Sequence, residues 1–247
     1  MNHGGINIEE WKIILNQTIN NQVDIQCLVE NNLNTHNFFT RRQLHHQLQQ
    51  SNLQTTSVWA SSELESNSSF QPGGTAIVTF GKTVGRMKNK GVDKLGRWSY
   101  IKLDGTATKE VMIVSLYQSC ETTNDGKNTF HLQQKVSLSL LNRSDINPRR
   151  NLLIDLKSFL TKSKQDNPNL TIIILGDWNE ESWDGNASKI CQEFNLVDIW
   201  KYHWPDEEFN TYSRGRRRID FALAPVEVAS KCKICYQPFY SRVIGDH

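Results

Sequence analysis

The segment Thr171-Ile172-Ile173-Ile174-Leu175-Gly176-Asp177-Trp178-Asn179 gives the clearest indication of the fold class. Its first five residues form a continuous apolar, largely β-branched run, which is typical of a strand buried on both faces. The chain becomes polar directly after the run, at Gly176 and Asp177. The segment therefore predicts a central strand of an α/β domain, ending in a polar turn of the kind where active sites gather.

Helical and strand patterns alternate on both sides of this segment. Helices are predicted at residues 9–21, 41–54, 149–163 and 187–194. Strands are predicted at residues 24–29, 75–78, 98–103, 111–116, 219–223 and 226–236, and a Ser/Asn-rich loop at 61–72. Because no linker or internal repeat interrupts the alternation, residues 1–247 are interpreted as one α/β domain with helices flanking its sheets.

The composition excludes several classes of protein. With 247 residues, 37% hydrophobic and 22% charged, the chain can bury a full core. No apolar run is long enough to cross a bilayer and no secretion signal opens the chain, so we expect no membrane partner. Five cysteines without regular spacing indicate a reducing, intracellular compartment, and we expect Cys232 and Cys235 on one strand. Since the net charge is only +2, any basic binding surface must be local.

Polar side chains that can carry chemistry stand at the ends of the predicted strands. They are Glu30, the pair Asp177 and Asn179, Asp220, and the pair Asp246 and His247. A carboxylate at the end of a buried strand is costly unless it is paired, hydrogen-bonded or bound to a metal. Each residue alone could have a structural role, such as capping a turn. Together they predict a single polar site.

The residue types restrict the chemistry of this site. Carboxylate and amide oxygens suit Mg²⁺ or Mn²⁺, and a histidine beside acidic residues suits proton transfer or contact with a phosphoryl oxygen. The sequence contains no nucleophilic-serine elbow, Walker loop or dinucleotide-binding glycine motif. Metal-assisted hydrolysis of a phosphate ester is the reaction that needs this set of groups.

The order of the motifs resembles that of the endonuclease/exonuclease/phosphatase superfamily, which includes apurinic endonucleases, deoxyribonuclease I and retrotransposon endonuclease domains. The matching segments are Asn2-His3-Gly4-Gly5, Val29-Glu30-Asn31-Asn32-Leu33, Gly73-Gly74-Thr75-Ala76-Ile77, Leu116-Tyr117, Gly176-Asp177-Trp178-Asn179, Arg218-Ile219-Asp220-Phe221 and Gly245-Asp246-His247. The resemblance implies a four-layered α/β-sandwich, in which two packed mixed β-sheets are flanked by helices, as in deoxyribonuclease I.

The resemblance also implies a role for each site residue. Glu30 would be the principal ligand of Mg²⁺ (or Mn²⁺), with Asp246 and Asn2 in or near the same shell. Asp177 would orient or deprotonate the attacking water. The remaining roles concern the phosphate: Asn179 would hold it, His247 would contact the oxygen that gains charge, Asp220 would orient His247, and Tyr117 would offer its hydroxyl.

Several positions depart from the family pattern. Gly4 replaces a frequent aspartate, Val29 replaces a glutamine, and Gly245 replaces a serine. Tyr117 is followed by Gln118-Ser119-Cys120, where the family has x-Pro. The chain begins near the motif asparagine and ends on the motif histidine. We therefore expect a monomeric domain that lacks its outermost N- and C-terminal strands and belongs to a longer polyprotein.

The substrate is the remaining question, and three interpretations compete. Arg214, Arg216, Arg217 and Arg218 precede Asp220 directly and, with Trp178, favour DNA and a nicking endonuclease of retroelement type. A DNA substrate would imply a nuclear location. The first alternative is a phosphatase acting on inositol phosphates or other small esters, although those enzymes tend to carry arginine after the aspartate. The second is a catalytically decayed nucleic-acid-binding domain. Arg41-Arg42 and Arg149-Arg150 are interpreted as surface residues.

Overall fold

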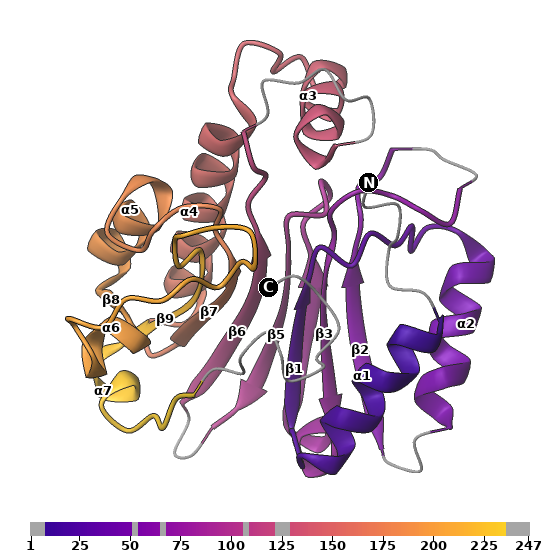
Figure 1. The fold of residues 1–247 in the computed structure, drawn as a ribbon, viewed down its shortest axis with the longest axis horizontal. Coiled ribbons are helices and arrows are strands. Elements are labelled where there is room, and N and C mark those ends of the chain that lie inside the picture. The colour runs from indigo at the N-terminus through magenta and orange to yellow at the C-terminus, as the bar shows by residue number, and fades with distance from the viewer. Residues whose placement is uncertain (1–7, 51–53, 65–67, 106–108, 122–128, 236–247) are drawn as a thin grey trace.

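The computed structural model describes residues 8–50, 54–64, 68–105, 109–121 and 129–235. Within these residues two β-sheets pack against each other, and helices cover both outer sides (Figure 1). The order of layers is α1 and α2, the smaller sheet, the larger sheet, then α4 and α5. This arrangement confirms the predicted four-layered α/β-sandwich.

The smaller sheet carries the first part of the chain. It has the order β1 (Ile25–Val29), β3 (Thr75–Phe80), β2 (Thr55–Ala60), and its described pairs are antiparallel. Two helices, α1 (Ile8–Asn20) and α2 (Phe38–Gln49), cover its outer face. The apolar residues of both helices recur on one side, so Trp11 and Leu15 of α1 and Leu44 and Leu48 of α2 join one core with β3.

The larger sheet carries the rest of the described chain. Its order is β4 (Met87–Val92), β5 (Trp98–Asp104), β6 (Glu110–Tyr117), β7 (Thr171–Asp177), β9 (Asp220–Pro225), β8 (Leu196–Asp198). Among its described strand pairs, β6 with β7 is parallel and the others are antiparallel. The connecting helices are η1 (Gly81–Arg86), α3 (Phe130–Leu140), α4 (Pro148–Asp166), α5 (Gly185–Phe194), α6 (Ile199–His203) and α7 (Val226–Ala229).

Two apolar layers hold the sandwich together. Leu152, Leu156 and Leu160 of α4 pack with Ile172 and Ile174 of β7 on the outer face of the larger sheet. Burying each such side chain contributes about 1.5–3 kcal/mol. Between the sheets a second layer combines Val58 and Ile77 with Ile101 and Leu103. The core therefore fixes how β1 lies against β6 and β7.

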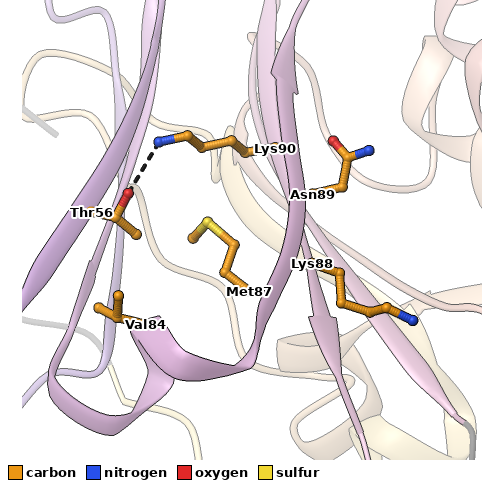
Figure 2. Close-up of a pocket in the computed structure, with 6 residues that line it drawn as sticks. All are labelled: Thr56, Val84, Met87, Lys88, Asn89 and Lys90. Atoms are coloured by element: carbon orange, nitrogen blue, oxygen red, sulfur yellow. Dashed lines mark hydrogen bonds between the residues drawn. The ribbon is translucent and has the colours of Figure 1, made fainter.

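One side of the sandwich is closed by a lysine that joins the two sheets. Figure 2 shows Lys90 of β4 pointing at Thr56 of β2, and its Nζ donates to Thr56 Oγ1 (3.0 Å) and to the Ser57 carbonyl (2.8 Å). A shallow hollow of about 560 Å³ lies here, lined also by Met87 and Val84. Because Lys90 is committed to this bridge, and lysines on edge strands discourage pairing with other chains, we interpret the hollow as structural.

Most predicted elements are confirmed, and one is wrong. The strand predicted at 226–236 is instead the short helix α7, followed by irregular chain as far as residue 235. Pro225 ends β9, and proline has no N–H to extend a ladder. Cys232 and Cys235 accordingly do not share a strand. In the part of the chain that the structure describes, no helix is both long and apolar enough to span a bilayer.

Candidate active site

Three predicted site residues line up across neighbouring strands of the larger sheet. The parallel register of β6 and β7 places Tyr117 opposite Asp177. The antiparallel register of β7 and β9 places Asp177 opposite Asp220. The end of β6, the end of β7 and the start of β9 therefore meet at one edge, which brings together residues that lie far apart in the sequence.

The smaller sheet adds Glu30 to this edge. Glu30 follows β1 directly and adopts a left-handed conformation (φ 50°), which turns the chain away from the strand. A hydrogen bond links its carboxylate to the hydroxyl of Tyr117. Nearby, Ser115 Oγ of β6 donates to the Leu28 carbonyl (3.0 Å) and so ties β1 to the larger sheet. Both sheets thus contribute to one site.

Tyr117 has a strongly perturbed hydroxyl. Burial raises the pKa of Tyr117 well above its usual value, and the charges of Glu30 and Asp177 with the hydrogen bond to Glu30 raise it further. The phenol therefore stays protonated and donates its proton to an oxygen acceptor. The strand register places Asp177 opposite Tyr117, which is consistent with the contribution of its charge to this shift.

The turn after β7 is held by its own side chains. Asp177 is almost fully buried and accepts from the backbone N–H of Asn179 (2.8 Å). The Asn179 side-chain amide donates to Asp177 (3.2 Å) and to the Gln118 carbonyl (2.7 Å). Asn179 has φ 49°, a left-handed conformation that asparagine tolerates better than most residues. A phosphate bound by this amide would have to replace one of these two bonds.

Gly176 is required because two strands approach closely before the turn. A Cβ at this position would lie 1.9 Å from the Leu116 carbonyl oxygen, a distance that no side chain can occupy. Gly176 therefore lets β7 lie against β6 in the register that aligns Tyr117 with Asp177.

A buried glutamine supports the turn from β6. Gln118, which is fully buried, donates its backbone N–H to the Asp177 carbonyl (2.9 Å) and its side-chain amide to the Trp178 carbonyl (2.5 Å). Its side-chain oxygen accepts from Asn186 Nδ2 of α5 (2.6 Å). The position that departs from the family's x-Pro pattern is thus a central support of the site.

Arg149 supports the turn from the other side. Its guanidinium pairs with Glu180 and donates to the carbonyls of Ser119 (3.2 Å) and Asn179 (3.4 Å). Glu180 in turn accepts from the backbone N–H of Ala187 at the start of α5 (2.7 Å). The interpretation of Arg149 as a surface residue is wrong, because its side chain is largely buried in this network.

Helix α3 closes the edge of the site above Tyr117. Phe130 stacks on the Tyr117 ring, with centroids 5.0 Å apart. The next residue, His131, is buried and lies 3.3 Å from Ser119 Oγ. Burial lowers the pKa of His131, and Lys135 and Arg149 act in the same direction. This histidine therefore favours its neutral form.

Two predicted nucleic-acid contacts disagree with the structure. Trp178 is 0% exposed and stacks on Phe221 at 5.6 Å with an interplanar angle of 4°, so no face of the ring is open to a base. Arg218 is buried in an ion pair with Asp198 and packs over Phe221. Both predictions followed from proximity to the site in sequence, whereas these side chains point into the core.

The other arginines of this cluster remain on the surface. Arg214, Arg216 and Arg217 are exposed in the segment that leads into β9. Thr211 Oγ1 fixes the end of this segment by accepting the backbone N–H groups of Ile219 and Asp220 (3.0 Å each). The exposed arginines thus precede Asp220 in a segment whose end is anchored at the site.

A hollow lined by both sheets reaches Asp220. Its volume is about 470 Å³, and its described lining comes from the end of α1, from β1, and from β7 and β9. Asp220 and Gly176 belong to this lining, together with Gln26 and Cys27 of β1. Asp220 can therefore be reached from this side of the sandwich.

One of the predicted ligands of a divalent metal ion lies among the described residues. It is Glu30, whose carboxylate oxygens suit Mg²⁺ or Mn²⁺. Asn2, Asp246 and His247, the other predicted site residues, lie outside the described residues. Within the described ranges, no group of three His, Cys, Asp or Glu side chains is arranged to hold a metal. The metal ligands therefore stay predictions.

Comparisons with known proteins identify the fold. No family model and no curated protein matches the chain. Among solved structures, an AP endonuclease from Archaeoglobus fulgidus matches with TM-score 0.56 and 16% identity, covering 99% of this chain and 94% of that one. A 3′ phosphatase, NExo, from Neisseria bound to product DNA hairpin matches with TM-score 0.56 and 16% identity, over 90% and 84%.

A phosphatase of a different kind matches equally well. It is a mannosyl-6-phosphatase from Bacteroides thetaiotaomicron, with TM-score 0.55 and 13% identity over 88% of this chain and 76% of that one. The chain therefore has a deoxyribonuclease I-like fold, which it shares with these structures and with an endonuclease/exonuclease/phosphatase family protein from Bacteroides thetaiotaomicron (TM-score 0.55, 12% identity). At these identities the likeness establishes the fold and leaves the substrate open.

Proposed function

We propose that this chain is a divalent-metal-dependent phosphodiesterase acting on nucleic acid, and specifically a DNA-nicking endonuclease. The observation that carries the proposal is the meeting of Glu30, Tyr117, Asp177 and Asp220 at one edge, on a fold that nucleases share. The exposed arginines before Asp220 support a substrate with several phosphates. The narrower assignment to a retroelement rests on the motif order alone.

Each residue of the candidate site has a proposed role in the hydrolysis. Glu30, with Asp246 and Asn2, would hold Mg²⁺ or Mn²⁺, which when bound stabilises negative charge on the phosphate. Asp177 orients or deprotonates the attacking water, and the Asn179 amide binds the scissile phosphate. The protonated Tyr117 hydroxyl donates to a phosphate or leaving-group oxygen. By the family resemblance, Asp220 would orient the ring of His247, and His247 would contact the oxygen that gains charge.

The test is nicking of supercoiled plasmid with Mg²⁺ and with EDTA. Asp177→Asn should lower the rate by about 10²–10⁴-fold, because it removes the acid–base group but keeps an acceptor for Asn179. Asp145→Asn is the matched control, since it removes the same charge from an exposed carboxylate and should nick at the unmodified rate. Mn²⁺ should also raise the Tm of the unmodified chain more than that of Glu30→Gln.

A second arm separates nuclease from phosphatase, because the same fold occurs in a sugar phosphatase. The chain is incubated with an inositol phosphate and with a sugar phosphate, and released phosphate is measured. Phosphate release without nicking would overturn the nuclease proposal in favour of the phosphatase. If the chain neither nicks plasmid nor releases phosphate but still binds DNA, the catalytically decayed binding domain would be favoured.

A further inference from the structure

The first turns of α2 carry an exposed surface that the proposed chemistry does not use. Phe38 and Phe39 are 60% and 71% exposed, and their rings meet edge to face with centroids 5.7 Å apart. Arg41 and Arg42 follow immediately and are also exposed. We call these four residues the α2 surface. Exposed apolar groups gathered in this way mark interaction sites more often than isolated ones do.

The α2 surface is held in place by its surroundings. Asn37 caps the helix by accepting from the backbone N–H groups of Phe39 (2.9 Å) and Thr40 (3.2 Å). Leu44 and Leu48 are buried against the smaller sheet, on the side of α2 that faces away from Phe39 and Arg42. The two phenylalanines are therefore exposed on a helix that is packed against the fold, so a partner would bind a surface that is already formed.

The positive charge of α2 favours a negatively charged partner. The helix contains two arginines and no aspartate or glutamate. Within the described part of the chain, neither guanidinium has an acidic partner in ion-pair contact. Aromatic rings beside arginines suit unpaired bases, which stack on the rings while phosphates meet the guanidinium groups. A duplex keeps the faces of its bases inside the stack, so the surface suits a single strand.

The position of α2 connects this surface to the site. β1 ends at Glu30, and β3, antiparallel to it, begins at the same edge. Backbone bonds from Asn32 to Gly73 (2.8 Å) and from Asn34 to Ser69 (2.8 Å) keep the segment after Glu30 at this edge. Phe38 follows Glu30 by eight positions, so the two lie at most about 29 Å apart. A short segment of nucleic acid bound at Glu30 can therefore reach the start of α2.

We infer that the α2 surface binds single-stranded nucleic acid that extends from the active site; this inference rests on the proposed function. The test is fluorescence anisotropy of the full chain with a labelled single-stranded oligonucleotide in EDTA, so that no cleavage occurs. Phe38→Ala/Phe39→Ala should weaken binding by about tenfold or more and leave the salt dependence unchanged. Arg41→Ala/Arg42→Ala should lower the salt slope by about 0.7 for each phosphate that is no longer neutralised.

Gln43→Ala/Gln49→Ala provides the matched control, because both side chains are exposed on the same helix, and it should bind like the unmodified chain. Circular dichroism checks that each variant keeps the fold. Unchanged binding in both test variants would overturn the inference and leave the phenylalanines as a contact for another protein. Plasmid nicking by the same proteins separates the two proposals. If the chain does not nick plasmid but Phe38→Ala/Phe39→Ala weakens binding, only the proposed function is overturned. If the chain nicks plasmid and the same substitutions leave binding unchanged, only the proposed role of the α2 surface is overturned.

Discussion

Gln118 connects four different partners at the candidate site through its backbone and its side chain. It contacts Asp177, Trp178, Asn179 and Asn186, at distances of 2.5–2.9 Å. Two of these bonds come from the fully buried side chain, so its removal would take one partner from the Trp178 carbonyl and one from the Asn186 amide. Each polar group left unpaired costs about 1–3 kcal/mol. Gln118 is therefore a positioning residue for Asp177 and Asn179.

Replacing Gln118 should affect turnover more than substrate binding. Gln118→Ala frees the Trp178 carbonyl and Asn186, and displacement of the turn should lower kcat for nicking by about 10- to 100-fold with little change in KM. Gln192→Ala, at an exposed position, serves as the control. The measurement is steady-state nicking at a temperature well below both Tm values. An unchanged kcat with a lowered Tm would mean that Gln118 acts only on stability.

At the scale of elements, the basic cluster before β9 contains arginines with two different roles. Arg218 pairs with Asp198, whose carboxylate also caps α6 by accepting from Trp200 N (3.0 Å) and Lys201 N (3.3 Å). The pair therefore joins β9 to α6 inside the core. Arg217 and Arg216 are exposed one and two positions earlier. A single run of basic residues thus contains both a structural and a surface part.

Stability measurements should separate these parts. Arg218→Ala leaves the Asp198 carboxylate buried without its partner and should lower the free energy of unfolding by about 3–5 kcal/mol. Arg216→Ala removes only an exposed charge and should change it by less than about 0.5 kcal/mol. Urea unfolding of both variants checks this expectation. Similar destabilisation by the two substitutions would contradict the assignment of Arg218 to the core.

Some elements have clear apolar patterns and were predicted, whereas an exposed edge strand was missed. The apolar run of β7 and the leucines of α4 bury most of their surface, so their patterns are clear. β4 is an exposed edge strand with two lysines, and its sequence therefore shows no alternation of apolar residues. The error at 226–236 arose because β-branched residues favour strands, whereas Pro225 stops the ladder.

At the scale of the whole molecule, the site depends on how two sheets pack, and a single sequence does not state that packing. Glu30 and Tyr117 were predicted from motifs, but the hydrogen bond between them exists only because β1 lies against β6. Arg149 and Gln118 were missed for the same reason: their partners Glu180 and Asn186 come from later segments. Strand ends were predictable, whereas the side chains that support them were not.

The packing of the sheets should respond to high pH through Cys27, which joins the apolar layer between them. Burial raises the pKa of Cys27 to about 12 from its usual 9.0. Because the folded chain holds this proton more tightly than the unfolded chain, the stabilisation is full below pH 9.0 and is lost as the pH rises towards 12. Unfolding by urea across this range should show a decline that Cys27→Ala reduces.

Comparison with Cys27→Ala isolates this effect, since other groups titrate in the same range in both proteins. An identical decline in the two proteins would show that Cys27 keeps its ordinary pKa. Thiol labelling at neutral pH offers an independent measurement: exposed Cys120 should react with a thiol reagent faster than half-buried Cys27, whose raised pKa disfavours the reactive thiolate.

The order in which the ribosome makes these elements has a consequence for when the chain can cut. Glu30 and Tyr117 are synthesised early, but Asp220 opens β9, which pairs with β7 across the Asp177–Asp220 register. A nascent chain that has not yet emerged as far as β9 therefore holds an incomplete set of catalytic groups. If the proposed function holds, hydrolytic activity would therefore arise only late in translation, when most of the fold has already been made.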